Sequence, residues 1–140
     1  MKDFCHGASL IESLVALAVF AIGSAATGTW FSTSVEADAR ASRIMAAVSA
    51  IADLRERMHS NPIGVASGDY NGALAHRSPG CGNGCAPAEL AMDDVDRFAR
   101  LLHEQLGRPA RHTLHCMDRS VCVVRISWDG RPLVAMSFKP

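Results

Sequence analysis

Residues 6–31 read HGASLIESLVALAVFAIGSAATGTWF, and this stretch decides how the chain is organised. After Glu12 no charged residue occurs until Glu36. About 20 apolar residues span a bilayer as a helix, so the stretch predicts a membrane helix, although serines and threonines dilute its far end. A carboxylate such as that of Glu12 is costly in hydrocarbon and usually marks a function.

Beyond this apolar run the pattern becomes periodic. Apolar residues recur at intervals of three and four, as on one face of an amphipathic helix: Ile44, Val48, Ile51, Leu54 and Met58. The first proline of the chain is Pro62, and Asn61-Pro62 followed by Gly64 predicts a stop. We therefore expect one continuous helix from residue 8 to about residue 60, whose second half packs against a soluble domain.

The rest of the chain predicts a small α+β domain. Residues 62–87 are rich in glycine and proline and are expected to form a loop. A helix is expected from Ala88 to Gly107, with one apolar face made of Ala91, Val95, Phe98, Leu102 and Leu106. Residues 114–138 show strand patterns with a hairpin signal at Asp129-Gly130. The expected fold is thus a long helix packed on a domain with one short helix and an antiparallel sheet.

The start of the chain carries a processing signal. The order Gly7-Ala8-Ser9-Leu10-Ile11-Glu12 resembles the class III signal of type IV prepilins and of the pseudopilins of type II secretion. The resemblance implies cleavage between Gly7 and Ala8 on the cytoplasmic side, methylation of the new α-amine of Ala8, and retention of the apolar run in the mature protein. Glu12 would then face the terminal ammonium of a neighbouring subunit. The simpler alternative is a carboxylate that the helix dipole favours.

Later segments are similar to the family of type IV pilus modification proteins named PilV. They are Ala21-Ile22-Gly23, residues 52–62, Gly68-Asp69-Tyr70, residues 81–94 and the strand that ends at Trp128. The resemblance covers nearly the whole chain. It implies a pilin-like fold and a minor pilin that assembles with other minor and major pilins to prime or cap the pilus.

The resemblance also implies a division of the chain and a location. Residues 1–7 would be a leader, 8–35 a transmembrane segment, 36–61 its amphipathic continuation and 62–140 a small periplasmic domain. The protein would stand in the inner membrane, meet the prepilin peptidase and the pilus assembly machinery there, and then enter the pilus. No cofactor is implied.

The cysteines fit this division. Cys5 lies in the expected leader, which leaves an even number in the mature chain: Cys81, Cys85, Cys116 and Cys122. Disulfides persist in oxidising compartments, and about 80 residues beyond the long helix make a core that benefits from cross-links. The spacing does not match usual zinc sites. Among a redox site, half a metal site and local disulfides, we predict Cys81–Cys85 and Cys116–Cys122 disulfides, the second across paired strands.

Other candidate sites have simple explanations. His112 and His115 are predicted to be exposed polar residues at a strand entry rather than metal ligands. Four arginines beside Asp118 form a mildly basic region, for which solvated surface is favoured over contact with DNA or a partner: Arg108, Arg111, Arg119 and Arg125. The chain has 14 basic and 14 acidic residues, whereas a dedicated nucleic-acid binder is expected to have a basic excess.

No catalytic arrangement stands out, so we predict that the protein is not an enzyme. Two alternatives to the pilus interpretation remain. A minor pseudopilin of a type II secretion system would share the leader and the overall design, and a membrane-anchored periplasmic enzyme would share the anchor. The PilV-like middle segment and the four later cysteines favour the pilus, while Glu12 argues against a simple anchor.

Overall fold

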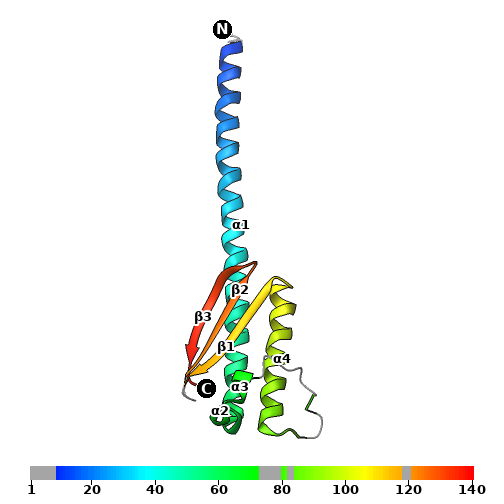
Figure 1. Ribbon diagram of the computed structural model, residues 1–140. Coiled ribbons are helices and arrows are strands. Elements are labelled where there is room, and N and C mark those ends of the chain that lie inside the picture. The colour runs from blue at the N-terminus through cyan, green and yellow to red at the C-terminus, as the bar shows by residue number, and fades with distance from the viewer. Residues whose placement is uncertain (1–8, 73–79, 82–83, 118–120) are drawn as a thin grey trace, which may run out of the picture. The chain divides into compact units, whose positions relative to one another are not determined.

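The computed structural model describes residues 9–72, 80–81, 84–117 and 121–140, and it confirms an α+β layout (Figure 1). The elements are α1 (Leu10–Ser60), α2 (Pro62–Ser67), α3 (Asp69–Gly72), α4 (Pro87–Leu106), β1 (Ala110–Met117), β2 (Val121–Trp128) and β3 (Arg131–Phe138). The chain divides into two compact units, residues 1–40 and residues 41–140. Helix α1 runs through the boundary, so the second unit starts inside the helix.

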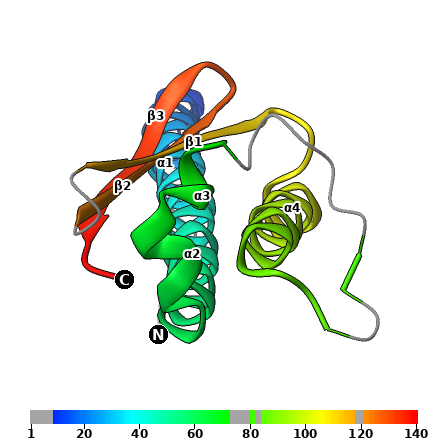
Figure 2. The same cartoon turned by 60° about the horizontal axis from the view of Figure 1, so that its bottom comes forward.

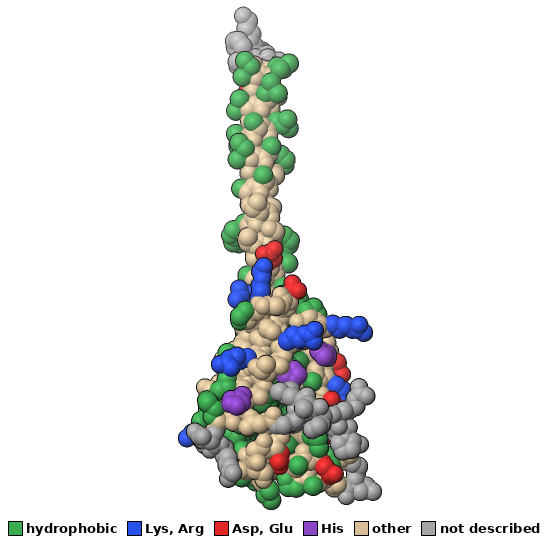
Figure 3. Space-filling model, viewed as in Figure 1, with side chains coloured by type: hydrophobic (Ala, Val, Ile, Leu, Met, Phe, Trp, Pro, Cys, Tyr) green, Lys and Arg blue, Asp and Glu red, His purple; other side chains and the backbone are tan. Residues whose placement is uncertain are grey.

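The part of α1 in the first unit has no packing partner among the described residues. Every side chain from Leu10 to Asp38 is exposed, and hydrophobic side chains project from both edges of the helix in the view of Figure 3. The hydroxyls of Thr27, Thr29 and Thr33 bond to carbonyl oxygens three or four residues earlier. These three hydroxyls, which dilute the apolar run, are therefore satisfied within the helix itself.

The second unit has one hydrophobic core. Helices α1 and α4 lie on the same side of the three-stranded sheet (Figure 2), and their apolar faces meet its inner face. The predicted stripe of α1 is confirmed at Ile51, Leu54 and Met58, which are buried. Ala47 and Ala50 are buried as well, while Ile44 and Val48 are only half-buried. The buried face of α1 therefore includes two alanines beside its larger apolar residues.

The predicted face of α4 is confirmed in full, because all five of its residues are buried: Ala91, Val95, Phe98, Leu102 and Leu106. The sheet has the order β1-β2-β3 and both pairings are antiparallel. The hairpin signal is confirmed too, since Asp129 and Gly130 have φ angles of 51° and 73°, as a type I′ turn requires. Strand β1 begins at Ala110, earlier than the sequence predicted.

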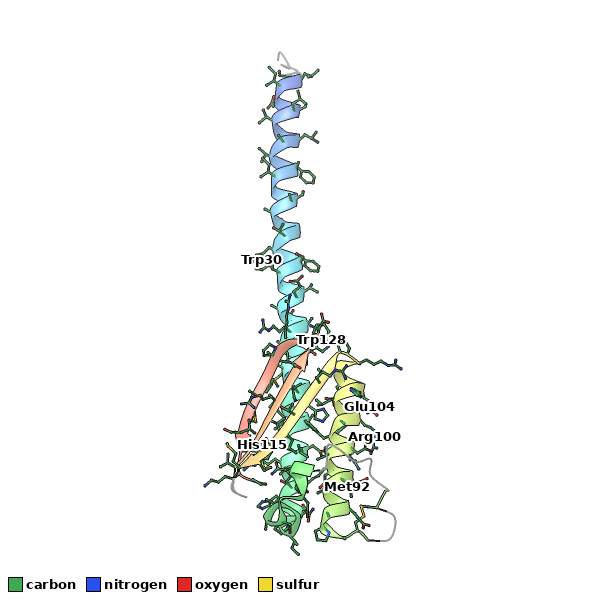
Figure 4. The ribbon with its side chains drawn as sticks, in the orientation of Figure 1. Trp30, Met92, Arg100, Glu104, His115 and Trp128 are labelled. Atoms are coloured by element: carbon green, nitrogen blue, oxygen red, sulfur yellow. A yellow bond between two sulfur atoms is a disulfide. The ribbon has the colours of Figure 1, made fainter. Side chains whose placement is uncertain are left out.

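One aromatic side chain of the sheet contacts both α1 and α4. The indole Nε1 of Trp128 donates to the carbonyl oxygen of Leu106, at 2.9 Å. The guanidinium of Arg43 lies 3.9 Å from the centre of the indole ring, within the range of a cation–π interaction. Trp128 lies where the sheet passes over α1 (Figure 4), and it connects α1 and the end of α4 to the sheet.

The expected loop at residues 62–87 is wrong over its first 11 residues, 62–72. Two short helices, α2 and α3, occupy residues 62–72. Proline stops a helix, but it also suits the first position of the next one, and here Pro62 opens α2 with Asn61 as its N-cap. Gly68, with φ of 80°, closes α2 in the left-handed conformation that glycine adopts readily. The described part of the domain therefore has three helices after α1, where the sequence predicted one.

Candidate functional site

The exposed part of α1 is the first candidate site. By length and composition the helix could cross a membrane: an 18-residue window has a mean hydropathy of 1.9, and none of that window is buried. About 20 residues separate Leu10 from Trp30, which corresponds to about 30 Å of helix, close to the thickness of the hydrocarbon layer. Trp30 is 76% exposed and projects from α1 (Figure 4). A tryptophan about 30 Å along the helix from Leu10 would suit the interface between the membrane and water.

Glu12 lies in the first turn of α1 and is exposed. Its carboxylate is the only charged group among the described residues before Glu36. The backbone amides of a first turn favour an anion, so the structure gives Glu12 a favourable helical position. The expected cleavage site, Gly7 and Ala8, lies outside the described residues.

A second candidate lies deep in the other unit, where Asn61 joins three segments. Its Oδ1 accepts from the backbone N–H of Gly64 at 3.2 Å. Its Nδ2 donates to the carbonyl oxygen of Pro87 at 2.9 Å and to the hydroxyl of Tyr70 at 3.3 Å. Asn61 is 4% exposed, so these bonds replace the water that a buried amide requires. A Cβ added to Gly64 would lie 2.5 Å from Asn61 Nδ2. Any side chain at position 64 would therefore collide with Asn61, which is why a glycine suits this position.

Tyr70 extends the network to α4. Its hydroxyl donates to Oδ2 of Asp94 at 2.7 Å, and Arg57 lies 3.7 Å from the other carboxylate oxygen of Asp94. Burial raises the pKa of the Asp94 carboxyl, and the Tyr70 hydroxyl and the Arg57 guanidinium offset part of that rise. Burial also raises the pKa of Tyr70, which keeps its hydroxyl protonated. Arg57 is held in turn by Asp53, at 2.8 Å.

We call Arg57, Asn61, Tyr70 and Asp94 the buried polar network. These residues come from the segments on which the resemblance to PilV proteins rests, yet the sequence did not indicate that they meet. One signal was available, because Asp94 falls on the same helical face as the apolar residues Ala91 and Phe98. The network holds the end of α1, α3 and the start of α4 together, and its geometry is that of a structural centre.

The cysteines lie in the predicted pairs at disulfide distance. Cys81 and Cys85 have sulfurs 2.03 Å apart, and Cys116 and Cys122 have sulfurs 2.00 Å apart. Cys116 and Cys122 face each other in the β1–β2 register, as the strand argument expected. Beside them, the amide of Asn71 bonds to both the N–H and the carbonyl oxygen of Cys116, at 2.7 and 3.0 Å. Among the residues that the structure describes, no group of three or more His, Cys, Asp or Glu could hold a metal ion.

The two histidines of β1 have different environments. His115 is exposed, near the end of the sheet (Figure 4). The expectation that His112 is exposed is wrong: its ring packs edge-on against Phe98, with centroids 5.2 Å apart, and its Nε2 is buried. Residues two apart on a strand share a face, so His112 points inward with Leu114. Burial lowers the pKa of His112, and nearby His103 lowers it further.

This environment predicts loss of stability in acid. His112 has a lower pKa in the folded state than its ordinary value of 6.5, so its contribution is complete above about pH 6.5 and is lost as the pH falls through the lowered folded value. We expect His112→Leu to flatten the fall of the melting temperature between about pH 7.5 and pH 4.5. The control His115→Gln should leave the wild-type slope unchanged. Equal slopes in all three proteins would contradict the prediction.

The remaining candidates are arginines, and Arg108, Arg111 and Arg125 are exposed. Arg119 lies outside the described residues. The chain belongs to a general class of protein. Proteins of this class have an exposed apolar helix at the N-terminal end that leads into a small α+β domain. No family model matches the sequence, and comparisons with curated proteins and with solved structures also give no match.

Proposed function

We propose that this chain is a PilV-like minor prepilin that joins other minor pilins to prime or cap a type IV pilus. The observation that carries the proposal is Glu12 at the start of a helix whose next charged residue is Glu36 and whose apolar side chains between these two residues are all exposed. A helix that is hydrophobic on all sides requires burial in lipid or among other helices. A single carboxylate at its first turn needs a partner in either setting.

The proposed mechanism is association. In the inner membrane the apolar part of α1 would span the bilayer, and in the filament it would pack among the helices of neighbouring subunits. Removal of residues 1–7 would create a terminal ammonium on Ala8, and the Glu12 carboxylate of one subunit would pair with the ammonium of the next. Because each charge alone would be costly in an apolar core, the pairing would fix the stagger between subunits.

The second unit would act as the recognition domain on the periplasmic side. Its core is small, and it is held by the buried polar network and by two cysteine pairs. A pseudopilin of type II secretion could use the same helix. The network residues favour the pilus instead, because they coincide with the segments that resemble PilV.

The proposal predicts a defined mature N-terminus. When the full chain is produced together with an active prepilin peptidase, mass spectrometry should find a chain that begins with methylated Ala8. Gly7→Leu should stay in the membrane at precursor mass, because the peptidase requires the small residue before the cut. A second prepilin processed in the same cells serves as the control. If that control is cleaved while this chain keeps Met1 or starts elsewhere, the prepilin assignment is wrong.

A further inference from the structure

The outer face of the sheet carries a shallow groove in the second unit. It has a volume of about 360 Å³ and is lined by residues of all three strands, among them Arg111, Thr113, Arg125, Ser127, Leu133 and Ala135. Residues of a strand alternate between its two faces. Ala110, Leu114, Val124 and Ile126 are buried on the inner face, which puts the lining arginines on the outer one. Figure 3 shows Lys and Arg side chains on this side of the domain.

The polar part of the groove has a regular design. In the register of β1 and β2, Arg111 lies opposite Ser127 and Thr113 lies opposite Arg125. Each arginine therefore has a hydroxyl as its cross-strand neighbour, and the two arginines occupy diagonal positions. Diagonal neighbours on one face of a sheet are about 7–8 Å apart. Both arginines are exposed and form no ion pair with any residue that the structure describes.

The charges and the walls of the groove favour one kind of ligand. Among the residues that the structure describes, no Asp or Glu lines the groove, and Pro132, Leu133 and Ala135 give it an apolar side. From residue 108 onward the chain has six Lys or Arg residues and two Asp residues. Guanidinium groups bind carboxylates and phosphates through paired hydrogen bonds. Proteins that bind nucleic-acid strands add aromatic stacking platforms, whereas here the wall is aliphatic and suits the side chains of a polypeptide.

We propose that this groove binds an extended acidic segment of a partner protein, with carboxylates at alternate positions. Residues two apart in an extended chain are about 6.6–6.8 Å apart on one side, which matches the diagonal separation of Arg111 and Arg125. The intervening side chain would face away, and neighbouring apolar groups would contact Leu133. This inference goes beyond the proposed function and holds whether or not the chain enters a filament.

A second copy of this chain is a weaker candidate for the occupant. The acidic residues at the start of α4 are already engaged within their own chain. Glu89 accepts from the backbone N–H of Ala86, Asp96 pairs with Arg100, and Asp94 belongs to the buried polar network. Helix geometry also spaces carboxylates differently from an extended segment.

The test uses the full chain in non-ionic detergent micelles and fluorescently labelled probes measured by anisotropy. The first probe is a peptide with the core Glu-Val-Glu-Val-Glu, the second replaces each Glu by Gln, and the third is a 20-base-pair DNA duplex. We expect the Glu peptide to bind at least about tenfold more tightly than the Gln peptide. Arg111→Ser with Arg125→Ser should remove that difference.

The matched control is Arg40→Ser with Arg97→Ser, which removes the same charge at exposed positions that do not line the groove. It should bind the Glu peptide within about twofold of wild type. Circular dichroism verifies that both double variants are folded. Equal binding of the Glu and Gln peptides, an equal loss in the control variant, or tighter binding to the duplex than to the Glu peptide would each overturn the proposal.

Discussion

Glu12→Leu is expected to yield a protein that is inserted and processed but is absent from sheared pili. The change makes the apolar run more hydrophobic, so insertion should not suffer. Cleavage should also persist, because it depends chiefly on Gly7. Filament entry should fail, since the ammonium on Ala8 of the neighbouring subunit would lose its partner. Removal of one member of a buried ion pair costs about 3–5 kcal/mol, which corresponds to a decrease in docking of at least a hundredfold.

The measurement compares processed protein in the membrane with protein in sheared pili, together with pilus number. Glu36→Gln is the matched control, because it also removes one carboxylate from α1 but lies at the far end of the uncharged run. That control should assemble normally. Normal incorporation of the Glu12→Leu protein would show that charge pairing plays no part, and Glu12 would then be only a carboxylate at a helix start.

Asn61→Ala is expected to cause the second large effect, a loss of stability in the second unit. The variant loses the cap of α2, at a cost of about 0.5–2 kcal/mol. It also leaves the Pro87 carbonyl, which accepts from Asn61, without that donor, and an unsatisfied buried group costs about 1–3 kcal/mol. We expect a total of roughly 2–4 kcal/mol, a large share of the stability of so small a domain.

Denaturant unfolding followed by the fluorescence of Trp128 measures this loss, in a Trp30→Phe background so that only one tryptophan reports. Ser60→Ala is the control at the adjacent position, because Ser60 is exposed and its hydroxyl bonds only within α1, to the carbonyl oxygen of Glu56. That variant should stay within about 0.5 kcal/mol of wild type. A similar result for Asn61→Ala would show that the network contributes little to folding.

The long helices and the hairpin could be predicted from the sequence because their signals are local. An apolar face repeated over several turns identifies α4, and a pair such as Asp129-Gly130 specifies a tight turn by backbone preference alone. Helices α2 and α3 escaped prediction because they have six and four residues, too few to show a period. They are held by bonds from Asn61 to Pro87 and from Tyr70 to Asp94, which are 26 and 24 positions apart and which no short window contains.

The site residues divide in the same way. Glu12 could be singled out because a charge within an apolar run is visible in the sequence itself. The bond between Tyr70 and Asp94 joins residues 24 positions apart, and such a pairing follows only from the packing of α3 and α4. His112 could have been placed correctly, since it shares its strand face with Leu114. The polar imidazole suggested an exposed residue. The alternation of side chains between the two faces of β1 instead places His112 on the buried face.

The amide of Asn71 limits how the sheet can grow. An open sheet normally offers two edges to which a foreign strand can add. At the β1 edge, the side-chain amide of Asn71 bonds to both the backbone N–H and the carbonyl oxygen of Cys116. These are the bonds that a neighbouring strand would otherwise form there. The opposite edge belongs to β3, where Pro132 has no N–H to donate. Backbone pairing with another strand is therefore blocked at Cys116 on the β1 edge, and it lacks one donor at Pro132 on the β3 edge.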